Sequence, residues 1–279
     1  MSSDLSAAGE GLLGSILLLS GIAVAPVAAW ALRRLHPGRN IVFARHGFSH
    51  VVVAVACVLV GSLLGSLVAT PLRGAEGEPS ILADLVAGAV AFACGVGYIV
   101  SVQVRLDPDG WRALGLRGDC HHGTAVLGGL GVWLIALPAI FGLGWIWSWL
   151  SSTFDLGDPA QEIAKRFMAL PEGQRFWPLV FGIAIVPLLE EILFRAFLQP
   201  LLVQNLRERA GIAVTAIVFG ALHGPAAFLQ VTGLAIVLGA VMLRTQSLFA
   251  VWAMHAAHNG LMFWLMYSVP EVRRWMGAE

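Results

Sequence analysis

Long apolar runs separated by short polar segments dominate the hydrophobic pattern of the chain. A helix needs about 20 mostly apolar residues to cross the roughly 30 Å hydrocarbon core of a bilayer. Eight runs approach this length: residues 11–32, 48–70, 81–104, 124–147, 176–199, 211–228, 230–243 and 248–268. Because the seventh run is short and the fifth contains three ionisable residues, seven spans is the alternative count. The pattern predicts an all-α polytopic membrane protein, a bundle of about eight transmembrane helices.

The composition agrees with this prediction. Hydrophobic residues make up 58% of the chain and charged residues only 12%, with a mean hydropathy of +0.79. A soluble domain carries about 25% charged residues. Lys+Arg and Asp+Glu balance at 17 each, so no basic field suggests a nucleic-acid partner. The three cysteines are scattered and form neither a disulfide framework nor a CxxC metal motif.

The distribution of basic residues predicts the orientation in the membrane. Acidic Asp4 and Glu10 precede the first apolar run, whereas four arginines follow it within residues 33–45. A cleaved signal peptide carries its positive charge first, so this run is predicted to be a retained span with the N-terminus outside. Alternating eight spans then places the more basic loops in the cytoplasm. The richness in Ala, Gly, Val and Leu is typical of a bacterial protein, which predicts a multi-pass location in the bacterial inner membrane.

The chain is predicted to divide into residues 1–158, with about four spans, and residues 159–279, which carry three clusters of polar residues at membrane depth. Ionisable groups there cost several kcal/mol unless they are paired or hydrated, so they are functional candidates. In the first cluster, Glu191 and Arg195 are four residues apart and can form an ion pair within the helix. Glu190 points about 100° away and remains available as a general base. The alternative is a purely structural ion pair.

The second and third clusters supply imidazole and amide groups. Phe219 and His223 share one face of the sixth run, and His255 and Asn259 share one face of the eighth. His258 lies on an adjacent face, where a packing role is the simpler interpretation. Measured along each helix from its predicted cytoplasmic end, the candidate groups lie about 12–18 Å deep. Three separate helices therefore place a carboxylate, imidazoles and an amide at one level, on the cytoplasmic side of the midplane.

These groups fit the hydrolysis of an amide bond. Glu190 and His223 could deprotonate a water, while His255 and Asn259 could stabilise an oxyanion. A divalent metal such as zinc, held by Glu190, His223 and His255, is an equally good way to activate the water. An HExxH helix and a GxSxG elbow are both absent from the sequence. No Ser, Thr or Cys stands on the motif faces to serve as a covalent nucleophile.

Three segments carry a resemblance to a known family. EEILFR at 190–195, FGALH at 219–223 and HAAHN at 255–259 resemble the EExxxR, FxxxH and HxxxN motifs of the CPBP family of intramembrane proteases. This family comprises CAAX-prenyl endoproteases of the Rce1 type and bacteriocin-processing enzymes. The resemblance covers roughly residues 160–268 and includes all three motifs in order.

The resemblance implies a bundle around an intramembrane cavity that opens to the cytoplasm and the bilayer. It implies that Glu190 activates water with help from His223, and that His255 and Asn259 stabilise the oxyanion. Glu191 and Arg195 would support the base, and Phe219 completes the second motif. The implied substrate is a membrane-associated protein or peptide. The alternatives are a proton-coupled transporter or a non-catalytic membrane adaptor that uses the same polar cluster.

Overall fold

The computed structural model describes residues 2–35, 44–73, 80–107, 109–116, 121–154 and 166–269. These residues form helices and connecting turns, without a strand among them. The long helices are α1 (Ser2–Arg34), α2 (Phe48–Ala69), α3 (Ile81–Leu106), α5 (His122–Thr153), the continuous helix Phe176–Leu206, α10 (Glu208–Leu222), α11 (Phe228–Thr245) and α12 (Leu248–Ser268). The short elements are α4 (Gly110–Ala113), η1 (Thr70–Leu72), η2 (Glu172–Gln174) and η5 (Pro225–Ala227). The predicted boundary at residues 158 and 159 lies outside the described residues.

Each predicted span coincides with one of the long helices. Six of the helices in the described part of the chain are long and apolar enough to cross a membrane: Gly14–Arg34, Phe48–Leu72, Ile81–Leu106, His122–Thr153, Phe176–Leu206 and Phe228–Thr245. The two long helices outside this set are α10, which has 15 residues, and α12, whose two histidines and one asparagine lower its mean hydropathy. The all-α polytopic bundle predicted from the sequence is confirmed.

The sixth helix ends earlier than the hydrophobic pattern predicts. The apolar run continues to residue 228, but α10 ends at Leu222. Gly224 adopts a φ of +79°, which residues with a Cβ rarely adopt. Pro225 has no N–H to continue the helix. His223 therefore lies at the end of a helix, beside a turn, instead of inside a span.

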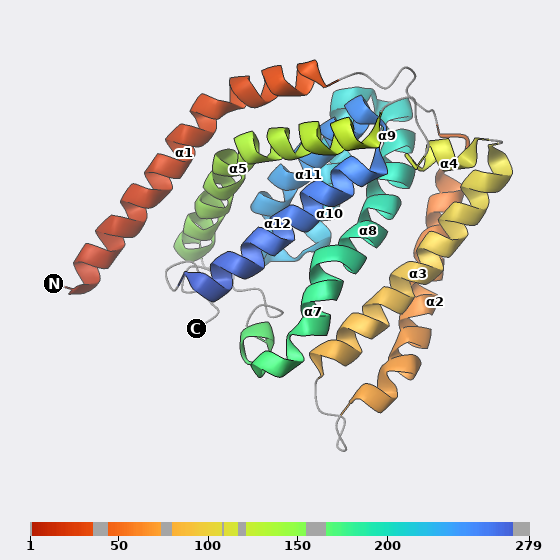
Figure 1. Cartoon of the computed structure of the whole chain (residues 1–279), viewed down its shortest axis with the longest axis horizontal. Helices are drawn as coiled ribbons and strands as arrows, with labels where there is room; N and C mark the ends of the chain where they lie inside the picture. The colour runs from red at the N-terminus through yellow and green to blue at the C-terminus, as the bar shows by residue number, and fades with distance from the viewer. Residues whose placement is uncertain are drawn as a thin grey trace.

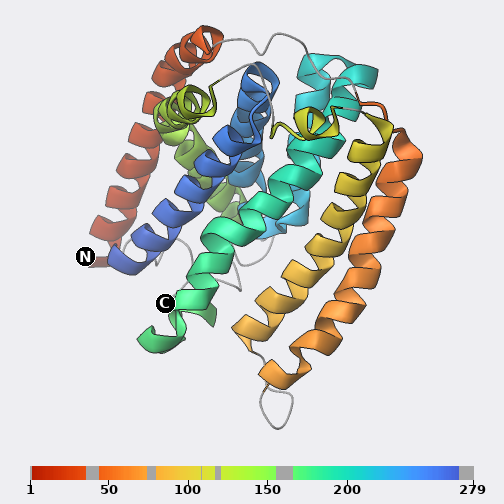
Figure 2. The ribbon, with the colours of Figure 1, turned by 45° about the vertical axis from the view of Figure 1, so that its right-hand side comes forward.

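The helices pack as two pairs around a central group (Figure 1). The pair α1 and α5 forms one side, and the pair α2 and α3 forms the other. Between them lie α10, α11, α12 and the helix Phe176–Leu206 (Figure 2). Glycines allow close approach within the pairs, because a Cβ on Gly65 would overlap the Ala87 carbonyl oxygen and a Cβ on Gly21 would lie 2.7 Å from the Ala139 Cα.

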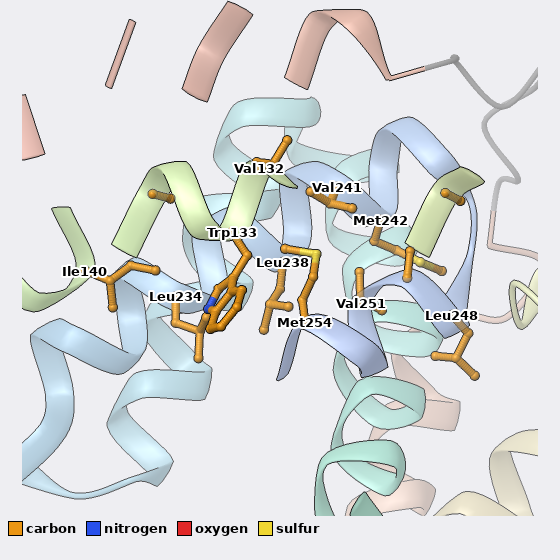
Figure 3. Close-up of a cluster of buried hydrophobic side chains, with 13 residues drawn as sticks. Val132, Trp133, Ile140, Leu234, Leu238, Val241, Met242, Leu248, Val251 and Met254 are labelled. Carbon is orange, nitrogen blue, oxygen red and sulfur yellow. The ribbon is translucent and has the colours of Figure 1, made fainter. Parts of the chain in front are cut away.

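The main hydrophobic core lies between α5, α11 and α12 (Figure 3). Trp133 of α5, Leu238 of α11 and Met254 of α12 meet at its centre, and the last two are fully buried. This core shields one side of α12, while the helix Phe176–Leu206 contacts another. As a result α12 can carry His255 and His258 at membrane depth, because its neighbours bury both side chains.

The helix Phe176–Leu206 contains two widened turns, which flank the glutamate pair. It consists of α7 (Phe176–Val180), the π-helical segment η3 (Phe181–Ile185), α8 (Val186–Glu191), the π-helical segment η4 (Ile192–Leu198) and α9 (Gln199–Leu206). The second residue after each π segment is a proline, Pro187 or Pro200. A proline in a regular α-helix clashes with the carbonyl four residues before it, and a π turn displaces that carbonyl.

In the widened turns, some backbone carbonyls accept hydrogen bonds from side chains of neighbouring segments. In the first, Asn259 Nδ2 donates to the Gly182 carbonyl at 2.8 Å and Trp252 Nε1 donates to the Ala184 carbonyl at 2.9 Å. Near the second, His46 Nε2 donates to the Phe197 carbonyl at 3.0 Å and Gln103 Nε2 donates to the Ala196 carbonyl at 3.5 Å. Because the bilayer core offers no water, these donors come from α12, from α3 and from the segment before α2.

His46 connects the N-terminal helices to the second widened turn. Its ring stacks on Phe197 with centroids 4.0 Å apart and is only 3% exposed. Burial lowers the pKa of His46 below the ordinary value of 6.5, although the hydrogen bond to the Phe197 carbonyl acts in the opposite direction. The ring is therefore neutral in the folded protein near neutral pH.

A pH dependence of stability follows from the lowered pKa of His46. Below a pH of about 6.5 the unfolded chain binds a proton at this residue and the folded chain does not, so stability falls as the pH falls through that value. We expect the midpoint of thermal unfolding in detergent to decrease between about pH 7.5 and 5.5. The decrease should be smaller in His46→Gln, which keeps a donor for Phe197 but does not titrate. An equal decrease in both proteins would exclude His46 as the source.

The predicted orientation can be tested with single cysteines in a cysteine-free variant. Asp109 lies near the start of α4, and Gln174 lies in η2 at the opposite end of the bundle (Figure 1). The charge bias predicts that Asp109→Cys faces the cytoplasm and Gln174→Cys faces outside. A membrane-impermeant maleimide added to intact right-side-out cells should label only Gln174→Cys. Labelling of only Asp109→Cys would reverse the orientation.

Candidate active site

The three predicted motifs come together inside the bundle. Glu190 and Glu191 end α8, directly before the second widened turn. His223 follows the last residue of α10, and His255 and Asn259 lie on α12. The structure therefore brings these residues into one cluster, from three segments that are far apart in the sequence.

The carboxylate of Glu190 lies between two imidazole rings. Its Oε1 is 3.9 Å from His223 Nε2, and its Oε2 is 3.8 Å from His255 Nε2. Both separations exceed a hydrogen-bond distance. A water about 2.8 Å from a carboxylate oxygen and from the facing nitrogen would fit beside either pair.

Each histidine is oriented by a contact of its other ring nitrogen. His223 Nδ1 is 2.7 Å from the Phe219 carbonyl, and His255 Nδ1 is 2.8 Å from Glu191 Oε1. A carbonyl or a carboxylate accepts a hydrogen bond, so Nδ1 carries the hydrogen in both rings. In the neutral ring, each Nε2 therefore directs a lone pair toward Glu190.

Behind His255 lies a buried ion pair. Arg195 Nε is 3.2 Å from Glu191 Oε2, and both side chains are 0% exposed. The two atoms are close but not aligned as a hydrogen bond, so the guanidinium nitrogens lack hydrogen-bond partners among the described protein atoms. A small cavity of about 20 Å³ beside Arg195 and Gln199 is large enough for one water that could satisfy them.

Phe219 holds the charged and imidazole groups in place. The Arg195 guanidinium carbon lies 4.9 Å from the centre of its ring, within the range of a cation–π contact. The centroids of the His223 and His255 rings lie 4.4 Å and 5.8 Å from the Phe219 centroid, and Phe194 packs edge-on against it. Phe219 is fully buried. The second motif therefore needs an aromatic residue because one ring contacts a guanidinium and two imidazoles.

The cluster lines a cavity of about 330 Å³ with mainly apolar walls. Apart from the motif residues, the lining includes Gly182, Leu85, Gln230, Phe263 and Met266. The cavity therefore extends from Glu190 toward the end of the bundle where α7 and α3 begin and α12 ends (Figure 1). The charge bias predicts that this end faces outside, whereas the family resemblance implies a cytoplasmic opening. These two expectations differ, and the cysteine labelling distinguishes them.

Two cavity residues were not assigned to the site from the sequence. His258 was interpreted as a packing residue, and its Nδ1 does accept a hydrogen bond from Trp133 Nε1 at 3.4 Å, but the residue also lines the cavity. Gln230 received no role, because a single glutamine near the start of an apolar run has no periodic partner. Only the packing of α11 against α12 shows that it faces the cavity.

The predicted metal ligands lie close together but do not form a metal site as they are arranged in this structure. Among the described residues, no three His, Cys, Asp or Glu side chains form a group that could hold a metal ion. Glu190, His223 and His255 are close to one another, but their present arrangement does not fit a three-ligand site. A metal at this position therefore remains a prediction, and no step below depends on one.

The ion pair behind the site should contribute strongly to the stability of the fold. Replacing Arg195 by methionine leaves Glu191 buried without its cation, which typically costs about 3–5 kcal/mol. We expect Arg195→Met to lower the free energy of unfolding by that amount in detergent. The double variant Glu191→Gln/Arg195→Met should recover part of the loss, because it removes both charges. A double variant that is no more stable than Arg195→Met would show that the charge pair is not the cause.

Comparison with known proteins agrees with this site. Residues 172–261 match the family described as "Type II CAAX prenyl endopeptidase Rce1-like". The matched region covers about a third of the chain and contains every residue of the three motifs. Neither a curated protein nor a solved structure matches the chain. An intramembrane endopeptidase, acting on a protein or peptide in the membrane, is the general activity that this match supports. The resemblance seen in the three motifs is confirmed: a family model for Rce1-like CAAX prenyl endopeptidases matches residues 172–261, the region that contains all three motifs.

Proposed function

We propose that this protein hydrolyses a peptide bond inside the bundle by activating a water directly at Glu190. The observation that carries the proposal is the position of the Glu190 carboxylate, within 4 Å of two Nε2 atoms in a mainly apolar cavity. A carboxylate in such a place has few partners other than a water or a substrate. This proposal assigns general-base catalysis to Glu190, with His223 as its assistant.

The first step is the attack of water on the substrate carbonyl. A water between Glu190 Oε1 and His223 Nε2 gives one proton to the carboxylate, while its oxygen forms a bond to the carbonyl carbon. His223 Nε2 accepts the second hydrogen of that water and fixes its direction, because Nδ1 of the same ring is committed to the Phe219 carbonyl. A tetrahedral intermediate with a negative oxygen results.

His255 and Asn259 are proposed to stabilise that oxygen. His255 can donate from Nε2 only when the ring is protonated, because Nδ1–H is already directed at Glu191. Two carboxylates and one guanidinium leave the cluster one negative charge, so one proton on His255 makes it neutral. Glu191 then supports the imidazolium as a carboxylate supports histidine in a catalytic triad. The Asn259 amide, fixed by the Gly182 carbonyl, has a second N–H for the oxyanion.

Collapse of the intermediate completes the reaction. The carbonyl re-forms as the bond to nitrogen breaks, and the proton held by Glu190 passes to the leaving nitrogen. The products are a carboxylic acid and an amine, so no external oxidant, reductant or group donor is required. Glu191, Arg195 and Phe219 have supporting roles, since each acts by holding a histidine or a charge in position.

The walls of the cavity favour apolar substrate segments. Leu85, Phe263 and Met266 line the cavity and belong to or pack against a hydrophobic cluster with Ile81 and Phe167. A volume of about 330 Å³ accommodates a short stretch of extended peptide and not a folded domain. We therefore propose a substrate peptide that reaches the site from the membrane with apolar side chains next to the cleaved bond.

The base at Glu190 can be tested by cleavage of a panel of membrane-tethered fluorogenic peptides with detergent-purified protein. Glu190→Gln keeps the size of the side chain but removes the base, so we expect kcat to fall by about 10²- to 10⁴-fold. His223→Ala should also lower kcat. The products should be identified by mass spectrometry, and each assay should be repeated with a chelator to reveal any need for a metal.

Glu208→Gln, an exposed carboxylate in the first turn of α10, is the matched control and should retain full activity. Retained cleavage in Glu190→Gln would refute the assignment of the base. A wild-type protein that cleaves no peptide but carries protons into liposomes, and loses this flux in Glu190→Gln, would favour the transporter alternative.

A further inference from the structure

Gln230 is a polar residue of the cavity to which neither the motifs nor the proposed chemistry assigns a role. It lies in the first turn of α11, which follows the turn after His223. Its side chain lines the cavity together with Glu190 and Asn259. A glutamine placed on this wall exposes a donor and an acceptor to a space that is otherwise mainly apolar.

The side-chain amide of Gln230 makes only a weak hydrogen bond within the protein. In the described part of the protein, its hydrogen-bond partner is the thioether of Met262, with Nε2 and Sδ 3.9 Å apart. A thioether is a weak acceptor, and the amide oxygen has no partner there. The other neutral polar side chains of the cavity are each committed to a protein partner: Asn259 to Gly182, His258 to Trp133 and His223 to Phe219.

A peptide that enters the cavity needs the kind of partner that Gln230 offers. Its backbone N–H and C=O groups must find partners, because the walls of the cavity are mainly apolar. A side-chain amide can accept from one N–H and donate to one C=O of the same extended segment. An unsatisfied amide in such a site is costly, so an uncommitted glutamine is better explained by a ligand than by packing.

We propose that Gln230 binds the main chain of the substrate next to the cleaved bond. Its contact Met262 lies three residues beyond Asn259 on α12, which is about 4.5 Å along the helix. Extended peptide advances about 3.3 Å per residue, so Gln230 pairs with a residue one or two positions from the cleaved bond. This assignment rests on the proposed endopeptidase function and adds a substrate-binding residue outside the three motifs.

The first test is a kinetic comparison on the peptide that the wild-type protein cleaves fastest. Gln230→Met has a similar length and shape but cannot pair with a peptide backbone. We expect it to raise KM about tenfold with a smaller effect on kcat, because it removes one buried hydrogen-bonded pair. Gln230→Asn keeps the amide and should recover part of the affinity. Gln174→Met, the same substitution at an exposed site in η2, should change neither constant.

A second test asks whether the amide contacts the substrate itself. Esters replace single amides of the peptide, one position at a time and never at the cleaved bond, so that each analogue lacks one N–H. One position should raise KM for the wild-type protein and have no further effect in Gln230→Met, since both changes remove the same contact. A merely structural role for Gln230 would not produce this non-additivity.

The outcomes separate this inference from the function on which it rests. Cleavage by the wild-type protein with an unchanged KM in Gln230→Met would overturn the role of Gln230 and leave the protease intact. Additive effects of every ester with Gln230→Met would do the same. Failure of the wild-type protein to cleave any peptide would refute the proposed function, and the role of Gln230 with it.

Discussion

The buried guanidinium of Arg195 is the group around which the rest of the site is arranged. A cation without solvent exposure is tolerated only when charges and polarisable groups surround it, and here Glu191 and the ring of Phe219 do so. Glu191 in turn orients His255, and Phe219 contacts both histidines. Three helices are thus connected through one charge, and the direction of each imidazole follows from that connection. The cluster is preorganised because its parts cannot move independently without exposing a charge to an apolar surrounding.

The need to satisfy backbone groups without water in the bilayer core explains the shape of the helix that carries the glutamates. Two prolines interrupt its hydrogen bonding, and two widened turns accommodate them. The carbonyls of these turns receive donors from Asn259 and Trp252 on one side, and from His46 and Gln103 on the other. The N-terminal helices lie outside the region matched to the Rce1-like family, but these donors show that they help to hold the glutamate helix in place.

The cavity combines an apolar wall with a few polar groups, and this balance suits a hydrolase that works inside a membrane. Apolar residues predominate on the cavity wall, and a less polar surrounding strengthens the electrostatic contacts among Glu190 and its histidines. The polar groups provide for a single water and for the backbone of a peptide. The position of the cavity in one half of the bundle makes the orientation of the protein central to its biology, because it determines from which side a substrate arrives.

The membrane class, the approximate positions of the helices, the family resemblance and the three motifs could all be predicted from the sequence. These follow from local properties: the length of apolar runs, the spacing of residues on one helical face, and the cost of ionisable groups in lipid. The hydrophobic pattern missed the end of α10 at Leu222, which the local pair Gly224 and Pro225 causes. Only the packed structure reveals that two π segments flank the glutamates and that His258 and Gln230 face the cavity. Those features depend on which helices meet and on which carbonyls find donors. Such contacts join residues far apart in the chain, and no periodicity of one segment encodes them.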